Sequence, residues 1–457
     1  MEKNTVRWTT AGALAGAITL LAGCGSTPTP PAAFARAEAA PTPTACPAEV
    51  PATATCLGGK DSQGAYYLIA KPADWNGHLV LHAHGGPSLG PATMKRAQED
   101  LTRWAIMVKA GYAYAGSSFR QGGVEVRAAA EDTERLRRIF LAHVGKPKRT
   151  ILHGQSWGGG VAAKAAEMYT QQSLGERPYD AVLLTSGLLA GGTRTYDFRT
   201  DLRAVYQYLC NNHPRPSETA YPLNIGLPVG DPMTPADLRK RVDECLALDK
   251  PAAQRTPEQQ AKVRTLENVI RVPASSLVSH LNWATFHFRD ISSQRTGGAS
   301  PFGNMGVRYR GSSDDEALNR GVVRMAADPA AYRKFSQDTD PTGRIPVPVL
   351  TAHWIGDPTV FVEVHHHFRQ LMDAAGQGAN LVQTFTTKGT HSYISDPTYP
   401  ALMAALLRWV DEGVKPTPAA IAAACPAFEP KFGAGCSFDA AYTPPPLESR
   451  VPPRQRP

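Results

Sequence analysis

Strand-like and helix-like segments alternate through two separate stretches of the chain. Short apolar runs bounded by turn residues, such as Tyr66 to Lys71, predict strands. Segments with apolar residues at helical spacing, such as Val124 to Val144, predict helices. The expected strands are 66–71, 78–84, 112–116, 149–153, 180–186, 347–353 and 381–386. The alternation predicts an α/β fold class: a mostly parallel sheet with helices on both faces.

A long segment of a different kind interrupts this alternation. Residues 191–343 contain helix-like segments, such as Pro257 to Ile270, that are broken by Pro and Gly. An insert of this length between two core strands is typical of a cap or lid. We expect a core in residues 46–190 and 344–415, a mainly helical cap in 191–343, and a C-terminal extension in 416–457. The Pro-rich end from Thr443 onward is expected to be disordered.

The N-terminal residues are typical of an export signal. Lys3 and Arg7 precede a short apolar run from Ala11 to Leu21, which is too short to span a bilayer. The run ends in Leu-Ala-Gly-Cys, which resembles a bacterial lipobox, so residues 1–23 are predicted to be a lipoprotein signal peptide and Cys24 the lipidated residue. The alternative is an ordinary signal peptide with Cys24 incidental. Residues 24–45 are rich in Pro, Thr and Ala and predict an extended tether.

The remaining cysteines are even in number, which favours disulfides in an exported protein. Neighbours in sequence are expected to pair, as Cys46–Cys56, Cys210–Cys245 and Cys425–Cys436. The alternative, free buried thiols, is less expected outside the cytoplasm. We therefore predict a cell-envelope protein that is attached to the membrane through Cys24.

Composition excludes several function classes. Hydrophobic residues make up 42% and charged residues 19% of the chain, which is ordinary for a globular protein. The net charge of +8 is spread along the chain, without the basic and aromatic clustering that binds nucleic acid. His365, His366 and His367 are adjacent in a predicted helix and therefore point in different directions. We predict no metal and no cofactor.

A serine motif joins an expected strand to an expected helix. Gly154-Gln155-Ser156-Trp157-Gly158 follows the strand 149–153 and precedes a helix in 158–170. In this context Gly-x-Ser-x-Gly is a nucleophile elbow, in which a strained turn projects the serine hydroxyl above the strand ends. Ser156 is therefore the predicted nucleophile.

His84-Gly85-Gly86-Pro87 follows the strand 78–84 and resembles the His-Gly-Gly motif of lipases, esterases and proline-type peptidases in the α/β-hydrolase superfamily. Together with the serine motif, the resemblance covers roughly half of the chain and implies an α/β-hydrolase fold with a sheet of about eight strands. It also implies an oxyanion hole made by the N–H of Gly86, with Gly85 as the alternative, and by the N–H of Trp157. Pro87 has no N–H to offer.

The superfamily places the acid and then the base after the serine. Asp357 follows the strand 347–353 and is the predicted acid; Glu363, inside the next helix, is the weaker alternative. His391 follows the strand 381–386 and is the predicted base. Asp396 also lies near His391, but it comes after the histidine and breaks the order.

These residues predict a serine hydrolase that cleaves a small carboxylic ester through an acyl-enzyme intermediate. One alternative is an exopeptidase that resembles proline iminopeptidases and acts on short peptides, with Asp314, Asp315 or Glu316 holding the substrate amine. Another is a surface lipoprotein that uses the same fold only for binding. Trp283, Phe286 and Phe288 of the cap are candidates for the substrate pocket, although such residues more often belong to a core.

Overall fold

The computed structural model of the chain describes residues 1–2, 34, 36–170 and 177–457. Residues 36–457 form one compact unit. Cys24 and nearly all of the predicted signal peptide lie outside the described residues. None of the described helices combines the length and the apolar character needed to cross a membrane.

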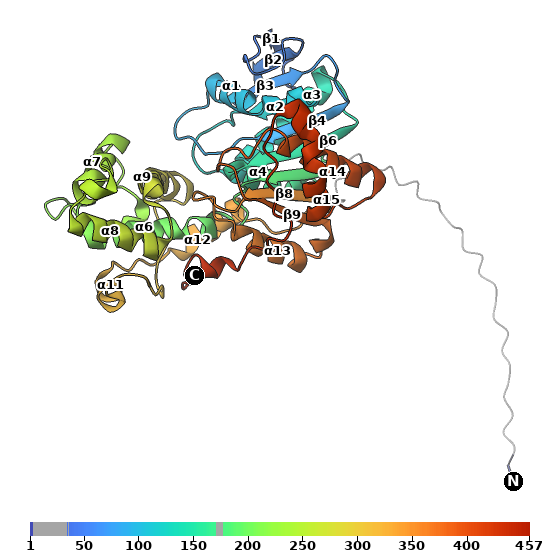
Figure 1. Cartoon of the computed structure of the whole chain (residues 1–457). Coiled ribbons are helices and arrows are strands. Elements are labelled where there is room, and N and C mark those ends of the chain that lie inside the picture. The colour runs from blue at the N-terminus through green and yellow to red at the C-terminus, as the bar shows by residue number, and fades with distance from the viewer. Residues whose placement is uncertain (3–33, 35, 171–176) are drawn as a thin grey trace. The chain divides into compact units, whose positions relative to one another are not determined.

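A nine-stranded sheet forms the centre of this unit (Figure 1). Its order is β1-β2-β3-β5-β4-β6-β7-β8-β9. The strands are β1 (Thr42–Thr44), β2 (Thr55–Lys60), β3 (Tyr66–Lys71), β4 (His78–Ala83), β5 (Ala113–Ser117), β6 (Arg149–Gln155), β7 (Ala181–Thr185), β8 (Val349–Trp354) and β9 (Leu381–Thr386). Strands β4 to β9 pair in parallel, and β1 to β3 are antiparallel to their neighbours. The predicted mostly parallel sheet is confirmed.

Helices cover both faces of the sheet. The core helices are α1 (Met94–Arg103), α2 (Ala105–Lys109), α3 (Val126–His143), α4 (Trp157–Tyr169), α13 (Val364–Ala374), α14 (Thr398–Glu412), α15 (Pro418–Ala424) and α16 (Glu429–Phe432). Apolar residues of α1, α2 and α14 share one buried cluster with Val80, Tyr114, Ile151 and Leu183 of the central strands. Side chains alternate along a strand, so the intervening residues face the other side, where α3 and α4 pack on each other and on the sheet.

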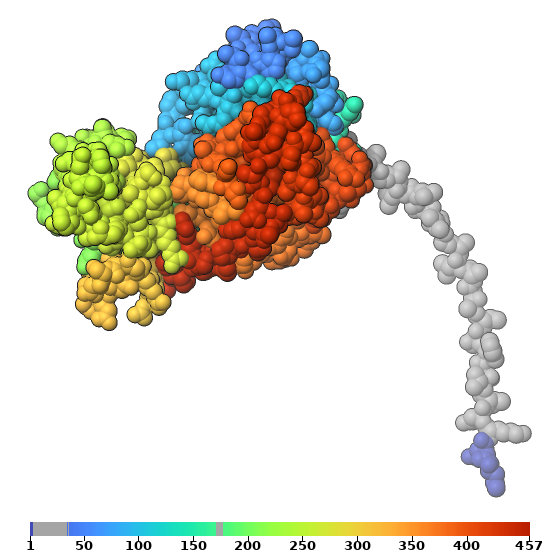
Figure 2. All heavy atoms as spheres, in the orientation of Figure 1, coloured from blue at the N-terminus to red at the C-terminus, as the bar shows by residue number. Residues whose placement is uncertain are grey.

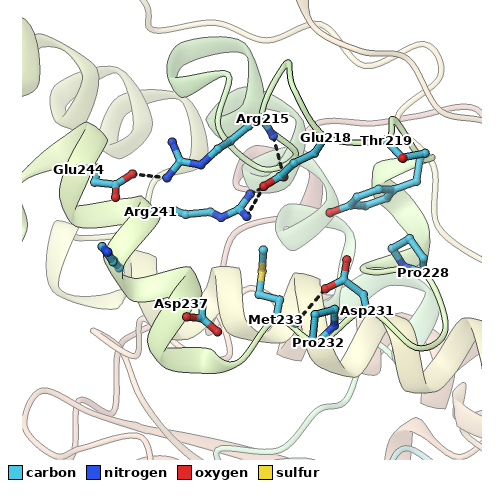
Figure 3. Close-up of a pocket in the computed structure, with 12 residues that line it drawn as sticks. Arg215, Glu218, Thr219, Pro228, Asp231, Pro232, Met233, Asp237, Arg241 and Glu244 are labelled. Atoms are coloured by element: carbon cyan, nitrogen blue, oxygen red, sulfur yellow. Dashed lines mark hydrogen bonds and ion pairs between the residues drawn. The ribbon is translucent and has the colours of Figure 1, made fainter.

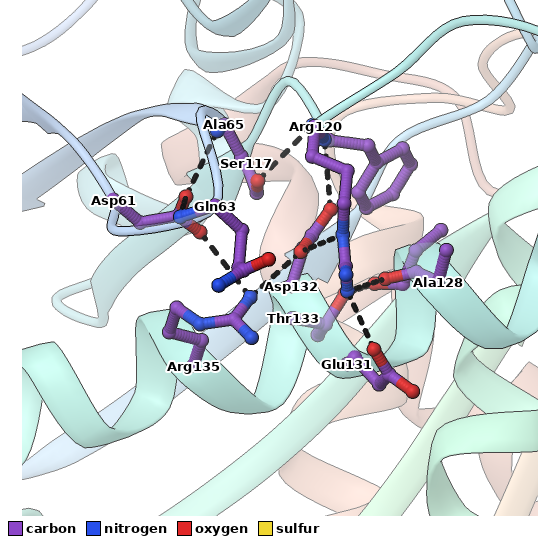
Figure 4. Close-up of polar contacts among 12 residues, drawn as sticks. Asp61, Gln63, Ala65, Ser117, Arg120, Ala128, Glu131, Asp132, Thr133 and Arg135 are labelled. Atoms are coloured by element: carbon purple, nitrogen blue, oxygen red, sulfur yellow. Dashed lines mark hydrogen bonds and ion pairs between the residues drawn. The ribbon is translucent and has the colours of Figure 1, made fainter. Parts of the chain in front are cut away.

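Buried charges fix α3 to the loop that follows β5 (Figure 4). The Asp132 carboxylate is fully buried and accepts hydrogen bonds from the Arg120 backbone N–H at 2.7 Å and from Arg120 Nε at 2.8 Å. Arg135 Nη1 donates to the same carboxylate at 2.8 Å and lies 3.6 Å from Asp61 on the β2–β3 turn. The Asp132 carboxylate therefore links α3 to the loop after β5 and, through Arg135, to the β2–β3 turn. Each arginine satisfies part of the hydrogen-bonding capacity of this carboxylate.

The chain between β7 and β8 is helical and stands beside the sheet as a separate lobe (Figure 2). Its elements are α5 (Gly192–Thr195), α6 (Asp197–Cys210), η3 (Leu223–Ile225), α7 (Pro235–Leu246), η4 (Ala252–Gln254), α8 (Pro257–Ile270), α9 (Ala274–Asn282), η5 (Trp283–His287), α10 (Phe288–Asp290), η6 (Ile291–Arg295), α11 (Asp315–Gly321) and α12 (Pro329–Thr339). We call this segment, residues 191–343, the cap.

Three disulfides are present, in the pairs expected from sequence proximity: Cys46–Cys56, Cys210–Cys245 and Cys425–Cys436. The first joins Cys46, directly after the predicted tether, to Cys56 of β2. The last residues of that tether are not unpacked as expected, because Thr42–Thr44 form β1 and pair with β2. The sequence signal is weak here, since an edge strand of Thr and Pro has no apolar face.

The C-terminal tail is a second correction. The sequence predicts disorder for it, but it packs on the cap and ends beside α12 (Figure 1). The Arg454 side chain is 2% exposed and binds Asp201 at 2.6 Å and Asp197 at 3.2 Å, both on α6. Arg456 also binds Asp197. Pairing of these charges offsets the cost of ordering a proline-rich segment that has little apolar surface.

Candidate active site

The serine motif lies where β6 passes into α4, as the sequence predicts. Ser156 has φ 56° and ψ −123°, which is a sparsely populated backbone region for a residue with a side chain. Both glycines of the motif are required by close backbone contacts. A Cβ on Gly154 would lie 2.2 Å from the Gly158 carbonyl oxygen, and one on Gly158 would lie 2.0 Å from the Ala83 carbonyl oxygen.

Backbone hydrogen bonds hold Ser156 in this conformation. Its N–H donates to Thr185 of β7 at 3.0 Å, and its carbonyl accepts from Gly159 and Leu188, each at 2.9 Å. A strained residue of this kind costs on the order of 1–3 kcal/mol. The strain persists because the adjacent strand and the following helix both constrain the turn, and it leaves the hydroxyl at the N-terminus of α4.

The structure brings the three predicted residues together. Ser156 Oγ lies 2.7 Å from His391 Nε2, and His391 Nδ1 lies 2.7 Å from Asp357 Oδ2. A carboxylate only accepts, so Nδ1 carries the proton and Nε2 is free to accept the serine proton. The arrangement can therefore transfer a proton from the serine hydroxyl to the imidazole.

Asp357 is bound from several sides. Its Oδ1 accepts the backbone N–H groups of Thr359 at 2.8 Å and Val360 at 3.2 Å. Burial alone would raise the pKa of Asp357, but the charge of His391 and hydrogen bonds from His353 and His391 hold that pKa well below its ordinary value. The carboxylate is therefore ionised when it orients His391.

The two alternative acids lie elsewhere. Glu363 is at the start of α13, and the carboxylate bonded to His391 is that of Asp357. Asp396 accepts a hydrogen bond from the Tyr393 hydroxyl at 2.7 Å.

Two buried histidines behind Asp357 were missed by the sequence analysis. His353 Nε2 lies 2.9 Å from the Val360 carbonyl and 3.3 Å from Asp357 Oδ2, so it is the protonated nitrogen. His353 Nδ1 then accepts from His365 Nε2 at 2.8 Å, and His365 Nδ1 accepts from the Thr351 hydroxyl at 3.1 Å. The sequence feature that could have indicated His353 was its position near the end of the strand that precedes Asp357.

Gln155 is a further missed residue. Its Nε2 donates to the backbone carbonyl of His391 at 2.8 Å, which ties the loop that carries His391 to the strand that leads into Ser156. Gln155 also packs against Gly85, where a Cβ would lie 2.2 Å from the Gln155 Oε1. The middle residues of Gly-x-Ser-x-Gly vary in character, so the motif alone did not indicate this role.

The predicted oxyanion loop lies directly beside the serine. A Cβ on Gly85 would be 3.1 Å from the Ser156 Cβ, and Gly86 has φ +67°, which favours glycine. Trp157 is the first residue of α4, so its N–H is one of the free amides at the helix N-terminus. His84 is buried, and burial together with Arg96 lowers its pKa to about 3, so it is neutral beneath the loop.

The cap contacts two loops of the candidate site: the oxyanion loop (residues 84–87) and the loop between β8 and α13 that carries Asp357 (residues 355–363), called the acid loop below. His287 Nε2 donates to the Pro87 carbonyl of the oxyanion loop at 2.9 Å, and His280 Nε2 donates to the Pro358 carbonyl of the acid loop at 2.9 Å. Of the aromatic candidates, Phe288 is fully buried and stacks on Phe302, which is a core role, and Phe286 is 7% exposed. Trp283 is half-buried and stacks on His287 with ring centroids 3.9 Å apart.

The acidic residues considered for an exopeptidase are used locally at α11, which Figure 1 places at the outer end of the cap. The Asp314 side chain caps α11 by accepting the Ala317 N–H, and Asp315 binds Ser312. Glu316 forms an exposed pair with Arg320. None of these contacts involves the Ser156 region.

Two hollows differ in their relation to the serine. One, in the cap (Figure 3), is lined by charged side chains that already pair with one another, as in Arg241–Glu218 and Arg215–Glu244, and none of the three candidate residues lines it. A smaller cavity of about 170 Å³ is bordered by His84, Pro87, Phe119 and Trp157, and so adjoins the oxyanion loop.

Within the described ranges, no group of three His, Cys, Asp or Glu side chains is placed to hold a metal ion.

A mostly parallel sheet, a strained serine between strand and helix, and an acid and a histidine after later strands define the α/β-hydrolase fold.

No protein-family model matches the chain, and no curated protein is significantly similar to it. Among solved structures, feruloyl esterase B from Aspergillus oryzae is 13% identical, with 83% of this chain and 88% of that chain covered and a TM-score of 0.42. Tannin acyl hydrolase from Aspergillus niger is 11% identical, with 83% of each chain covered and a TM-score of 0.39. An esterase of the bacterial hormone-sensitive lipase family is 13% identical, with 84% and 86% covered and a TM-score of 0.37. At these values the likeness carries no information on substrate.

Proposed function

We propose that this chain is a serine hydrolase that cleaves carboxylic esters through an acyl-enzyme intermediate. The observation that carries the proposal is the pair of 2.7 Å hydrogen bonds from Ser156 to His391 and from His391 to Asp357. The strained backbone of Ser156 and the adjacent oxyanion loop support the same conclusion, because a structural serine needs neither.

The reaction has two steps. His391 Nε2 takes the Ser156 proton while Oγ attacks the ester carbonyl carbon, and the N–H groups of Gly86 and Trp157 stabilise the oxyanion, with Gly85 as the alternative donor. His391 then gives the proton to the leaving alcohol as the carbon–oxygen bond breaks. A water molecule, deprotonated by His391, attacks the acyl-serine and releases the acid, and Asp357 holds the imidazole tautomer throughout.

The test is hydrolysis of p-nitrophenyl butyrate by Ser156→Ala. We expect the rate to fall by at least about 10³-fold, because the nucleophile is lost. Ser279→Ala, at an exposed position of α9, is the matched control and should keep the parent rate. A Ser156→Ala protein that hydrolyses the ester at the parent rate contradicts the proposal.

For location, we propose export followed by lipid attachment at Cys24. The lipobox-like sequence supports the proposal, as do the three disulfides, which are typical of oxidising compartments. Mass spectrometry of the mature N-terminal peptide should find diacylglyceryl-cysteine at position 24, and Cys24→Ser should move the protein from the membrane fraction to the soluble fraction. An unmodified Cys24 in the mature protein contradicts the proposal.

A further inference from the structure

One buried arginine of the cap has no acidic partner among the residues that the structure describes. Arg199 lies on α6 and is 2% exposed. In the part of the chain that the structure describes, its one hydrogen bond runs from Nη2 to the Thr359 carbonyl at 3.3 Å, while Nε and Nη1 have no partner. Burial lowers the pKa of Arg199 to about 10, against the opposing influence of Tyr196 and Asp357, and this leaves the side chain charged at neutral pH. A buried charge without a counter-ion is strongly unfavourable.

Asp357 does not serve as that counter-ion. Its Oδ2 is bound by His391 and His353, and its Oδ1 accepts the N–H groups of Thr359 and Val360. Every oxygen of this carboxylate is therefore occupied by the groups that position it for His391. Arg199 lies next to the acid loop but retains free donors.

Other buried arginines show what a purely structural role requires here. Arg454 binds the carboxylates of Asp197 and Asp201. Arg203, one turn after Arg199 on α6, also lacks a carboxylate, but it donates to the His213 carbonyl and to the Tyr221 hydroxyl within the cap. Arg199 differs because its single bond is to the loop that carries the candidate acid.

The surroundings of Arg199 are suited to hold a guanidinium in place. Its Cζ lies 4.7 Å from the ring centroid of Phe198, 4.9 Å from that of Trp283 and 5.2 Å from that of Tyr196. Aromatic faces stabilise the cation without using its N–H donors. Within the described ranges the Tyr196 hydroxyl is also buried without a partner, and its ring lies against the guanidinium, so a second donor is available there.

The aromatic residues around Arg199 also connect it to the oxyanion loop. Trp283 stacks on His287, and His287 donates to the Pro87 carbonyl of the oxyanion loop. Arg199 on α6 therefore contacts the acid loop, and its neighbour Trp283 links it through His287 to the oxyanion loop. Ser156 itself is 9% exposed, so a substrate must reach it past the residues that cover it.

We propose that Arg199 binds a free carboxylate of the substrate, so that the preferred esters are anionic, with a carboxylate on either the acyl chain or the leaving group. The inference rests on the proposed ester hydrolysis at Ser156 and names its substrate class. A carboxylate at this position supplies the missing counter-ion and accepts the free N–H donors of the arginine.

The test compares carboxylate esters with their neutral amide isosteres in the wild-type protein. For the acyl side, the pair is p-nitrophenyl hydrogen adipate and p-nitrophenyl 5-carbamoylpentanoate. For the leaving group, the pair is 4-(carboxymethyl)phenyl butyrate and 4-(carbamoylmethyl)phenyl butyrate. We expect kcat/KM to favour the carboxylate by about tenfold or more in one of the two pairs, because a charge-assisted hydrogen bond forms only with the anion.

Variants attribute the preference to Arg199. Arg199→Met should bring the carboxylate-to-amide ratio to about one or below, and Arg203→Met, the buried control on the same helix, should keep the wild-type ratio. The wild-type comparison stands even if Arg199→Met does not fold. Hydrolysis of both members of each pair at equal rates, or a preference for the amides, overturns this inference alone. Failure of all four esters to react overturns the proposed function and the inference with it.

Discussion

At the scale of single residues, the candidate site depends on donors and acceptors that fit one protonation pattern. His391 donates through Nδ1 and accepts through Nε2, and His353 donates toward Asp357 while it accepts from His365. Each of these imidazoles must therefore adopt the tautomer that its hydrogen-bond partners require. The consequence is that a change at Asp357 alters the state of His391 without moving it.

Asp357→Asn tests that dependence. The amide keeps the size of the carboxylate and can still accept the Thr359 N–H, but it cannot hold the Nδ1–H tautomer of His391. We expect kcat for p-nitrophenyl butyrate to fall roughly 10³- to 10⁴-fold. Thermal unfolding should show that the variant is folded. A loss of less than about tenfold contradicts the role assigned to Asp357.

The sequence predicted the residues that carry a motif and missed those that only support it. Ser156, His391 and Asp357 each follow an expected strand, so their position in the chain indicated them before any geometry was known. Gln155 acts through a contact with His391, far away in sequence, whereas His353 contacts Asp357 only four residues further on. A single sequence has no signal for the Gln155 contact, because that contact depends on how strand β6 and the loop after β9 are placed in the fold.

At the scale of elements, the turn between β6 and α4 is held by close packing of backbone on backbone. Gly158→Ala should destabilise the protein by about 3 kcal/mol or more, because its Cβ would lie 2.0 Å from the Ala83 carbonyl oxygen. Gly160→Ala, on the same helix, meets nothing closer than 3.4 Å and should be neutral or slightly stabilising. Urea unfolding measures both. Equal stability of the two variants would show that the turn tolerates a side chain at Gly158.

The C-terminal tail makes the second prediction at this scale. Arg454→Met removes a buried cation and leaves Asp197 and Asp201 without their main partner, so we expect a loss of about 3–5 kcal/mol in the free energy of unfolding. Arg320→Met, which breaks an exposed pair with Glu316, should cost less than about 1 kcal/mol. Protection of the tail from proteolysis should fall only in Arg454→Met. Similar small losses in both variants would mean that the tail contributes nothing to stability.

Element prediction from the sequence succeeded where apolar residues have a clear period. The bounds of β3, β9 and α8 are those expected, since each is bordered by turn residues or by a Thr-Pro start. Met94 to Ala110 has apolar residues at helical spacing throughout, but the structure divides this segment at Trp104 into α1 and α2. The prediction of a disordered tail is wrong because it depends on proline content alone, whereas two arginines of the tail find carboxylates that only the folded cap brings together.

At the scale of the whole molecule, several histidines are buried in neutral form. Burial is the main cause that lowers the pKa of His153, His84 and His280 to about 3 in each case. An unfolded histidine has a pKa of about 6.5. Between pH 6.5 and 3 the unfolded chain therefore binds more protons than the folded one, and stability is lost as the pH falls through that window.

His280→Gln tests the size of this effect. Each buried neutral histidine contributes a slope of about 1.4 kcal/mol per pH unit within the window. The variant should therefore lose about 2 kcal/mol less stability than the wild type between pH 7 and pH 5, measured by urea unfolding at each pH. His143→Gln, at an exposed position of α3, should follow the wild-type curve. Parallel curves for wild type and His280→Gln would contradict the neutral state of His280.

Covalent labelling decides whether Ser156 is an activated nucleophile. The folded protein is treated with a fluorophosphonate, digested and analysed by tandem mass spectrometry. We predict one phosphonylated serine, at position 156, and loss of that label in His391→Ala, because the hydroxyl needs its base. An unlabelled Ser156 in the folded wild-type protein, or equal labelling of several surface serines, would contradict the proposed nucleophile.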